Sequence, residues 1–278
     1  MFSSSRKCVR KTKEQMYIDH LSSAQNLKVK NIIALKEKSS FRRESGLFVA
    51  EGVREVEAAL EGGFEIESLY FVPDLISEEK IQQFKSEKYF TLSADIYSKV
   101  AYRGTTEGVI AVIKHKERRL RDIKLSKNPL IIVLESVEKP GNLGAVLRTA
   151  DAARADAVII CDPLTDIFNP NVIRASIGGV FTNNIIACTS AEALEWLESN
   201  KIRILTAELQ ASVRYDLADL KGAIAIVMGT ESEGLSSFWR DRANERIIIP
   251  MGGFRDSLNV SVSTAIICFE ALRQRDFK

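Results

Sequence analysis

The stretch IIIPMGGFRDSLNVSVSTAII, residues 247–267, decides how the second half of this 278-residue chain folds. Its three leading isoleucines are continuous and β-branched, as expected of a strand covered on both faces, and Pro250 ends that strand because it donates no ladder hydrogen bond. The two glycines that follow allow a turn. Ser257, Asn259 and Ser261 are good N-cap residues, so a helix should begin among them. Polar groups therefore gather at a helix N-terminus, a place that binds anions or polar ligands.

Buried strands alternate with helices through the rest of this half. Apolar, β-branched runs predict strands at residues 130–134, 158–160, 184–187, 202–206, 224–227 and 247–249. Helical segments stand between most of them. This alternation predicts a mostly parallel, doubly wound sheet with ligand chemistry at the carboxyl ends of its strands. By spacing alone, however, residues 247–267 are equally compatible with an ordinary structural unit.

A second informative stretch is GNLGAVLRTA, residues 141–150, which opens a helix after the first of these strands. The apolar positions with i, i+3, i+4, i+7 spacing, which face the core, are Leu143, Val146, Leu147 and Ala150. Arg148 points nearly opposite and, because helical side chains lean toward the N-terminus, it should lie over the bare Gly144. We therefore expect a cationic group above a gap through which a ligand reaches the backbone. A plain surface arginine is the alternative that this pattern leaves open.

Three ordered segments resemble the signature motifs of the SpoU (TrmH) family of RNA ribose methyltransferases. They are GNLGAVLRTA at 141–150, MGTESEGL at 228–235, and PMG followed by SLNVS within 250–261. The resemblance implies that residues 129–278 form an α/β methyltransferase domain, a mostly parallel sheet tied in a trefoil knot. It implies S-adenosyl-L-methionine as the cofactor and a ribose 2′-hydroxyl of RNA as the methyl acceptor. A homodimer without a metal is also implied, since the family builds its site near the subunit interface.

The same resemblance assigns roles to individual residues. The catalytic residues that it implies are Arg148, Asn142, Glu231, Ser257 and Asn259. The residues that would border the cofactor are Gly229, Ile249, Met251 and Leu258. Because a guanidinium holds its proton firmly, we expect Arg148 to stabilise the forming alkoxide rather than to act as a base.

The first half reads as a separate, small α/β unit over residues 26–114. Helices are predicted at residues 29–43, 53–60, 77–86 and 93–98, and strands at 48–50, 66–72 and 109–113. Many members of the resembled family carry an RNA-binding domain at this place, and residues 51–52 and 104–109 resemble it. The candidates for RNA contact are Arg54, Arg103, Arg42 and Arg43 here, and Arg174 and Ser176 in the later segment NPNVIRAS, residues 169–176.

Basic charge is concentrated at the front of the chain. The first 50 residues hold 11 Lys and Arg against 4 Asp and Glu, a net of +7, so the remainder carries −5 of the overall +2. Residues 1–25 are predicted to be a flexible basic extension. A mitochondrial presequence is a weaker alternative, because Glu14 and Asp19 interrupt the basic, serine-bearing pattern of such a segment. Residues 115–128 are predicted to be a basic linker. In a protein that holds RNA, both clusters are candidates for phosphate contact, and a solvated tail or linker is the alternative.

Composition excludes several other classes of protein. Hydrophobic content of 45% and charged content of 27% are typical of a soluble globular protein, and no apolar run approaches a membrane span, so we expect a cytoplasmic protein. Four cysteines without paired spacing disfavour a disulfide framework or a zinc site. With only two histidines, His20 and His115, chemistry that depends on a Ser-His pair is close to excluded.

Two alternatives to a ribosomal RNA methyltransferase remain at this level. Ribosomal RNA is favoured over transfer RNA because of the additional N-terminal domain, and a transfer RNA 2′-O-methyltransferase is the nearest alternative. A non-catalytic RNA-binding or ribosome-assembly protein of the same fold is the other. A dinucleotide-binding protein is disfavoured because residues 141–144, GNLG, do not supply a G-x-G-x-x-G turn.

Overall fold

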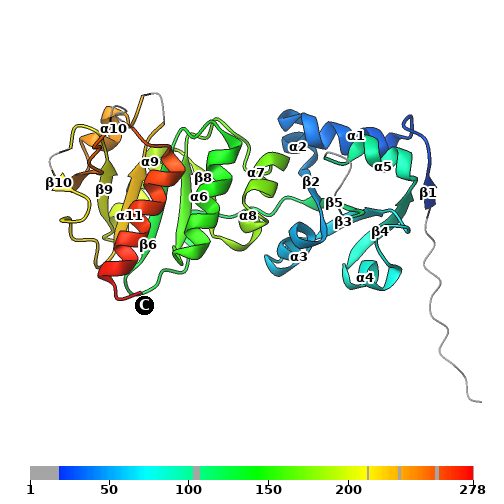
Figure 1. The fold of residues 1–278 in the computed structure, drawn as a ribbon, viewed down its shortest axis with the longest axis horizontal. Coiled ribbons are helices and arrows are strands. Elements are labelled where there is room, and N and C mark those ends of the chain that lie inside the picture. Colours follow the sequence, from blue (N-terminus) through cyan, green and yellow to red (C-terminus); the bar gives the residue numbers. More distant parts are fainter. Residues whose placement is uncertain (1–18, 103–106, 212, 231–232, 254–256, 278) are drawn as a thin grey trace, which may run out of the picture.

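The computed structural model describes residues 19–102, 107–211, 213–230, 233–253 and 257–277. It contains two α/β domains that lie side by side (Figure 1). The first extends from β1 (Asp19–Leu21) to β5 (Val109–Lys114), and the second from β6 (Leu130–Glu135) to α11 (Val260–Gln274). Among the described residues, no helix is long and apolar enough to cross a membrane.

The N-terminal domain is a five-stranded sheet in the order β1-β4-β3-β5-β2. Its other strands are β2 (Leu47–Glu51), β3 (Ile66–Phe71) and β4 (Ser86–Leu92), and its helices are α1 (Leu27–Glu37), α2 (Ser39–Ser45), α3 (Val53–Glu61), α4 (Glu78–Gln83) and α5 (Ala94–Val100). Strands β1, β4 and β3 are parallel, whereas β5 runs antiparallel to β3 and β2. The α/β character predicted for this half is confirmed.

Three details of the N-terminal domain differ from the sequence prediction. The helix predicted over residues 29–43 is two helices, because Lys38 has an extended backbone between α1 and α2. Strand β4 was missed because its residues, SEKYFTL, are half polar and follow a helical pattern. Strand β1 pairs with β4 from Asp19 onward, so the folded domain begins before residue 26. The rest of the predicted flexible extension, residues 1–18, lies outside the described residues.

The C-terminal domain is a seven-stranded sheet, parallel in every pairing, in the order β10-β12-β9-β11-β6-β7-β8. Its remaining strands are β7 (Ala157–Cys161), β8 (Ile185–Cys188), β9 (Arg203–Ala207), β10 (Val213–Arg214), β11 (Ile224–Met228) and β12 (Glu245–Ile248). The six predicted strands are present, and the two-residue β10 is additional. Strand β12 is only partly buried, and of its residues only Ile247 is fully buried, so it is not covered on both faces as predicted.

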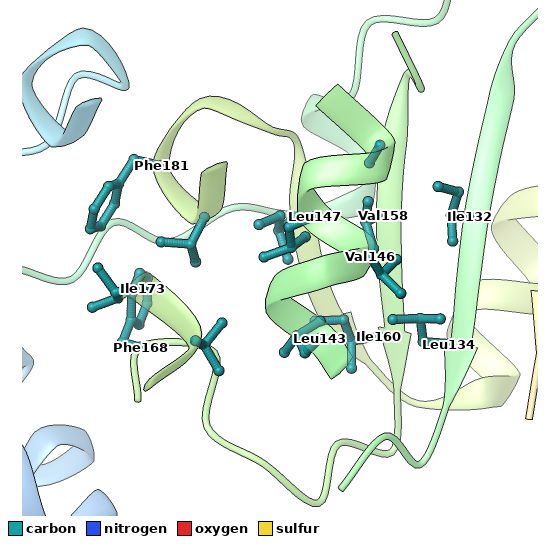
Figure 2. Packing of buried hydrophobic residues seen from close by; sticks show 14 of the residues in the cluster. Ile132, Leu134, Leu143, Val146, Leu147, Val158, Ile160, Phe168, Ile173 and Phe181 are labelled. Atoms are coloured by element: carbon teal, nitrogen blue, oxygen red, sulfur yellow. The ribbon is translucent and has the colours of Figure 1, made fainter. Parts of the chain in front are cut away.

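Helices cover both faces of this sheet. The helices of the domain are α6 (Pro140–Ala152), α7 (Pro170–Ala175), α8 (Gly179–Thr182), α9 (Ser190–Ser199), α10 (Ser237–Arg240) and α11. Alternate residues of β6 separate the two packing layers: Ile132 packs in the cluster that contains α6 and α11, and Ile131 in the cluster that contains α9 and Trp239 of α10. Figure 2 shows the apolar side of α6 against the sheet, with Phe168 and Phe181 beyond it toward the N-terminal domain.

The connection between the domains is more ordered than a solvated basic linker. Residues 115–128 include a short 3-10 helix at Leu120–Asp122. Arg118 donates to the carbonyl oxygens of Phe181 and Asn183, and burial lowers its pKa. Arg119 pairs with Glu117. These charges satisfy groups of the chain itself, so Arg118 is not available for the phosphate contact that was one of the two alternatives for this cluster.

Candidate active site

Three loops meet at the carboxyl ends of β9, β11 and β12. They enclose a cavity of about 440 Å³. Its lining residues are Ala207, Glu208, Leu209, Gln210, Met228, Gly229, Thr230, Glu233, Gly234, Leu235, Arg240, Ile247, Ile249, Met251, Ser257, Leu258, Val260 and Ser263. All four residues predicted to border a cofactor, and Ser257, therefore lie around one cavity. This is the edge of a parallel sheet at which ligands bind.

The loop after β11 is held in a tight backbone turn. Thr230 and Gly234 exchange two backbone hydrogen bonds of 3.1 Å, and Gly234 has a φ of +71°. A Cβ on Gly229 would fall on the backbone of Gly234, so only glycine fits where the chain folds back on itself. Beyond the turn, Glu135 at the end of β6 accepts from the Ser236 amide at 2.8 Å and from its hydroxyl at 2.5 Å. Glu231, the predicted catalytic acid, lies outside the described residues.

The Asn142–Asn259 pair joins the first motif to the third. Asn259 is the N-cap of α11, and its Oδ1 accepts from the amide and the hydroxyl of Ser261 at 2.9 and 2.6 Å. Its Nδ2 donates to Oδ1 of Asn142, at the start of α6, over 3.1 Å. A second, smaller cavity of about 90 Å³ lies beside Asn142 and shares Met228, Gly229, Thr230 and Val260 with the larger one. The two predicted asparagines therefore lie next to the cavity.

Sequence reasoning missed a carboxylate in the larger cavity. Glu208 follows β9, its amide donates to Ile247, and its carboxylate accepts from the Thr206 hydroxyl at 2.6 Å. Arg246 lies 3.9 Å from the same carboxylate. Its position directly after a parallel strand was the signal that could have identified Glu208. Such a buried carboxylate can accept hydrogen bonds from hydroxyl or ammonium groups of a ligand.

The cavity suits S-adenosylmethionine in size and in chemistry. Its volume lies within the range of roughly 300–1,000 Å³ typical of small-molecule sites. Apolar walls from Met228, Ile249, Met251 and Leu258 suit an adenine ring, and the carboxylates of Glu208 and Glu233 suit hydroxyl and cationic groups. The loop amides add donors for polar atoms. The residues present therefore fit the cofactor.

Helix α6 differs from the sequence prediction at Gly144. A Cβ there would meet Ala175 and the amide of Ser176, because α7 packs directly against α6. The expected gap for a ligand is therefore filled by protein, and the interpretation that Arg148 covers an open backbone is wrong. Arg148 itself is exposed, six residues or roughly 9 Å along the helix from Asn142. Among the described residues, those that line the two cavities do not include Arg148.

The candidates for RNA contact divide into exposed and buried residues. Arg54 and Arg43 are exposed. Arg174 stacks over the ring of Tyr102 with its guanidinium carbon 3.5 Å from the ring centroid. Arg42, by contrast, is 2% exposed and bonded to Asp166, so it faces the protein interior and not RNA.

The remaining candidates for RNA contact are Ser176 and Arg103. Ser176 is 3% exposed, and its hydroxyl donates to Ile173 and accepts from Val180. This arrangement assigns Ser176 to packing and corrects its predicted RNA contact. Arg103 lies outside the described residues.

Comparison with known families identifies both domains. The model of the SpoU rRNA Methylase family matches residues 129–269. The chain belongs to this family. A second model, the MRM3-like substrate binding domain, matches residues 26–111. The C-terminal domain thus has the knotted α/β fold of SpoU methyltransferases, and the N-terminal domain is a substrate-binding domain.

Proteins similar to this chain are named as ribosomal RNA methyltransferases. The 23S rRNA (guanosine-2′-O-)-methyltransferase RlmB of Pseudomonas syringae is 36% identical over 182 residues, which cover 63% of this chain and 73% of the relative. The 23S rRNA (guanosine(2553)-2′-O)-methyltransferase RlmP of Bacillus subtilis is 27% identical over 90% of this chain and 97% of its own length. An AdoMet-bound rRNA methyltransferase from Sinorhizobium meliloti superposes with a TM-score of 0.84 at 30% identity, over 92% of this chain and 98% of the other.

Family membership defines the type of reaction. The chain is an RNA 2′-O-ribose methyltransferase that uses S-adenosylmethionine, as the motif resemblance implied. The residues that line the cavity at the carboxyl ends of β9, β11 and β12 fit this cofactor.

The two roles of Asn259 can be separated by substitution. Asn259→Ala removes the N-cap acceptor and the bond to Asn142, and should lower the free energy of unfolding by about 1 kcal/mol. Asn259→Asp keeps the acceptor but loses the amide donor, so stability should stay within about 0.5 kcal/mol of wild type. We expect both variants to lose about tenfold or more in the methyl-transfer rate, because orientation at the reacting centre is disturbed.

Denaturant unfolding and single-turnover methyl transfer measure the two effects. A matched control is Asn26→Ala. Asn26 caps α1 in the N-terminal domain through the same type of bond, since its Oδ1 accepts from the Lys28 amide at 2.9 Å. It should lose stability without loss of rate. A wild-type rate in Asn259→Asp would show that the asparagine pair is not needed.

Proposed function

We propose that this chain methylates the 2′-hydroxyl of a guanosine in large-subunit ribosomal RNA. The observation that carries the proposal is the position of the Asn142–Asn259 pair beside the cavity that fits the cofactor. The substrate is suggested by the relatives, which are named for guanosines of 23S rRNA. The substrate-binding domain in front of the methyltransferase domain is consistent with a large, folded RNA.

In the proposed mechanism, the cofactor supplies a methyl group on a positively charged sulfur. The residues of the chain bind and orient the reactants. The tight turn at Gly229 and the apolar wall of Ile249 and Leu258 would hold the cofactor in the cavity. Asn142 and Asn259 present amide groups where the ribose would lie. Arg148 is a fixed cation, so it stabilises the negative charge that develops on the ribose oxygen.

A homodimer would bring Arg148 to a cavity, since it lies away from those of its own chain. Helix α11 and the residues before it expose an apolar stripe in which Leu258, Val262 and Phe269 are 40%, 46% and 45% accessible. Exposed apolar surface of this kind typically marks an interface. Leu258 belongs both to this stripe and to the wall of the cavity. We therefore place a second copy of this chain on α11, so that each subunit contributes Arg148 to the other.

The proposal also covers the metal requirement of the reaction and the location of the protein in the cell. Methyl transfer from sulfonium needs no Lewis acid, and the described residues contain no group of three or more metal-ligating side chains. We infer that the reaction proceeds without a metal, so a chelator should leave the rate unchanged on RNA that folds without Mg²⁺. We also infer a cytoplasmic location, which fractionation with ribosomal particles would test.

The first prediction concerns the substrate. Purified protein with labelled S-adenosylmethionine should transfer methyl groups to unmodified 23S ribosomal RNA, and nucleoside mass spectrometry should identify 2′-O-methylguanosine. A transfer RNA pool serves as the competing substrate. Methylation of transfer RNA alone would overturn the choice of RNA. Absence of cofactor binding in calorimetry would favour a non-catalytic RNA-binding protein.

The second prediction concerns Arg148. If this residue acts through its charge, Arg148→Lys should keep part of the activity, with a loss of about 10- to 100-fold, while Arg148→Ala should lose about 10³-fold. The affinity for S-adenosylmethionine should stay within twofold in both. Arg154→Lys, an exposed residue just past α6, is the control and should react at the wild-type rate. Complete inactivity of Arg148→Lys with intact cofactor binding would contradict a purely electrostatic role.

The third prediction concerns the dimer. Phe269→Glu places a charge in the apolar stripe of α11 and should shift the sedimentation profile from dimer to monomer, with loss of methyl transfer. Leu27→Glu is the matched control, since Leu27 is 71% exposed at the start of α1 in the other domain. This control should remain dimeric. A monomeric wild-type protein that transfers methyl groups at the full rate would refute the shared site.

A further inference from the structure

One segment of the methyltransferase domain contacts both the substrate-binding domain and the helix that carries Asn142. It comprises residues 164–183, between β7 and β8, and includes α7 and α8 (Figure 1). We refer to it as the bridging segment. Ile177 and Gly178, with φ values of +52° and +77°, reverse the chain between its two helices. A β-branched residue rarely adopts this conformation, so the surrounding packing must hold the reversal in place.

On one side, the bridging segment packs against aromatic residues of the substrate-binding domain. Phe168 stacks on Phe48 of β2, with ring centroids 4.3 Å apart and an interplanar angle of 10°. Phe181 meets Phe64 edge-on at 5.2 Å. All four rings are buried in the hydrophobic cluster that continues into α6. Domain interfaces within one chain usually resemble transient, polar contacts, whereas this one is built like a core.

A buried ion pair lies beside these rings. Arg42 of α2 donates through Nε to Asp166 of the bridging segment at 2.5 Å, and through Nη1 to the carbonyl oxygen of Leu35 at 2.7 Å. Asp166 also accepts from the amide of Phe168 at 2.9 Å. Because Arg42 is almost fully buried, neither charge can be left unpaired without a large penalty. The pair therefore defines one orientation of the two domains.

On its other side, the bridging segment is pressed against α6. Ala175 occupies the space over Gly144, two residues after Asn142 in α6. The side-chain amide of Asn183 donates to the carbonyl oxygen of Leu147 at 3.2 Å. The same short segment thus fixes the substrate-binding domain and the helix with the candidate catalytic residues.

We propose that the bridging segment holds the substrate-binding domain at a fixed distance and angle from the active site, with Arg42 and Asp166 as positioning residues that select which ribose of a bound RNA reaches the cavity. This inference rests on the proposed function, because it assumes an RNA substrate. An RNA held by a rigidly placed domain meets the cavity at a high effective concentration, which is lost when the domains separate. The substrate would be recognised by the spacing between its bound region and the reacting nucleotide.

Two independent changes loosen the junction without altering residues around the cavity. Asp166→Asn removes one charge of the pair at nearly constant shape. Gly62→Ala acts as a wedge, because a Cβ at Gly62 would collide with the backbone of Phe181. Glu67→Gln is the matched control, since Glu67 forms a partly exposed ion pair with Lys88 in the same domain, 2.7 Å long.

The measurements are the RNA KM, the kcat at saturating RNA, and the calorimetric affinity for S-adenosylmethionine, on protein shown to be folded by circular dichroism. Both loosened variants should raise the RNA KM by about tenfold or more. Their kcat should stay within about threefold and their cofactor affinity should not change. Trypsin should cut the basic residues 115–128 faster than in wild type. The control should match wild type in every readout.

The outcomes separate this inference from the proposed function. Methylation by wild type with an unchanged RNA KM in a variant whose linker is cut faster would overturn the positioning role and leave the function intact. A fall in kcat at constant KM would also overturn it, because the residues would then act on the catalytic helix alone. If Asp166→Asn does not fold, Gly62→Ala provides the same test, because it opens the junction without leaving an unpaired charge.

Discussion

The active site depends on the parallel register of β9, β11 and β12. In that register Thr206 lies opposite Val227 and Ala207 opposite Ile247, so the three strands end within about one residue of each other. The loops that follow them therefore begin at one edge and can enclose a single cavity. A slip by one residue would turn the alternate side chains to the other face of the sheet and move the Ile247 carbonyl oxygen away from the Glu208 amide. The register of the strands therefore determines where the cavity lies, and the loops determine its shape.

Close backbone approach then joins separate parts of the chain into one site. Gly229 lets the loop after β11 fold onto Gly234, and Gly144 lets α7 lie directly on α6. At both glycines, backbone or side-chain atoms of the protein fill the position that a Cβ would take. Their effect is indirect: the first shapes the wall of the cavity, and the second places the bridging segment where it reaches both domains. The second glycine thus joins the bridging segment to the helix that carries Asn142.

The sequence predicted the fold class and most strands because their signals are local. Runs such as residues 130–134 are long, apolar and β-branched, and the N-cap at Asn259 is visible from residue type and position. What failed was information that depends on distant residues. Strand β4 has a weak pattern and is stabilised by its neighbours β1 and β3. The space over Gly144 appeared open because no local rule reveals that Ala175, 31 residues later, fills it.

The arginines illustrate the same limit for function. By charge alone, Arg42, Arg118 and Arg174 were equivalent candidates for phosphate contact. In the structure, Arg42 neutralises Asp166, Arg118 donates to two carbonyl oxygens, and Arg174 stacks on Tyr102. Burial lowers the pKa of Arg118 and also that of Arg275, which donates to the carbonyl oxygens of Leu220, Asn128 and Gly222. A guanidinium has several donors, so it can donate hydrogen bonds to buried carbonyl oxygens as well as to phosphate. The basic surface available to RNA is consequently smaller than the sequence suggests, because Arg42 and Arg118 are occupied by groups of the protein itself.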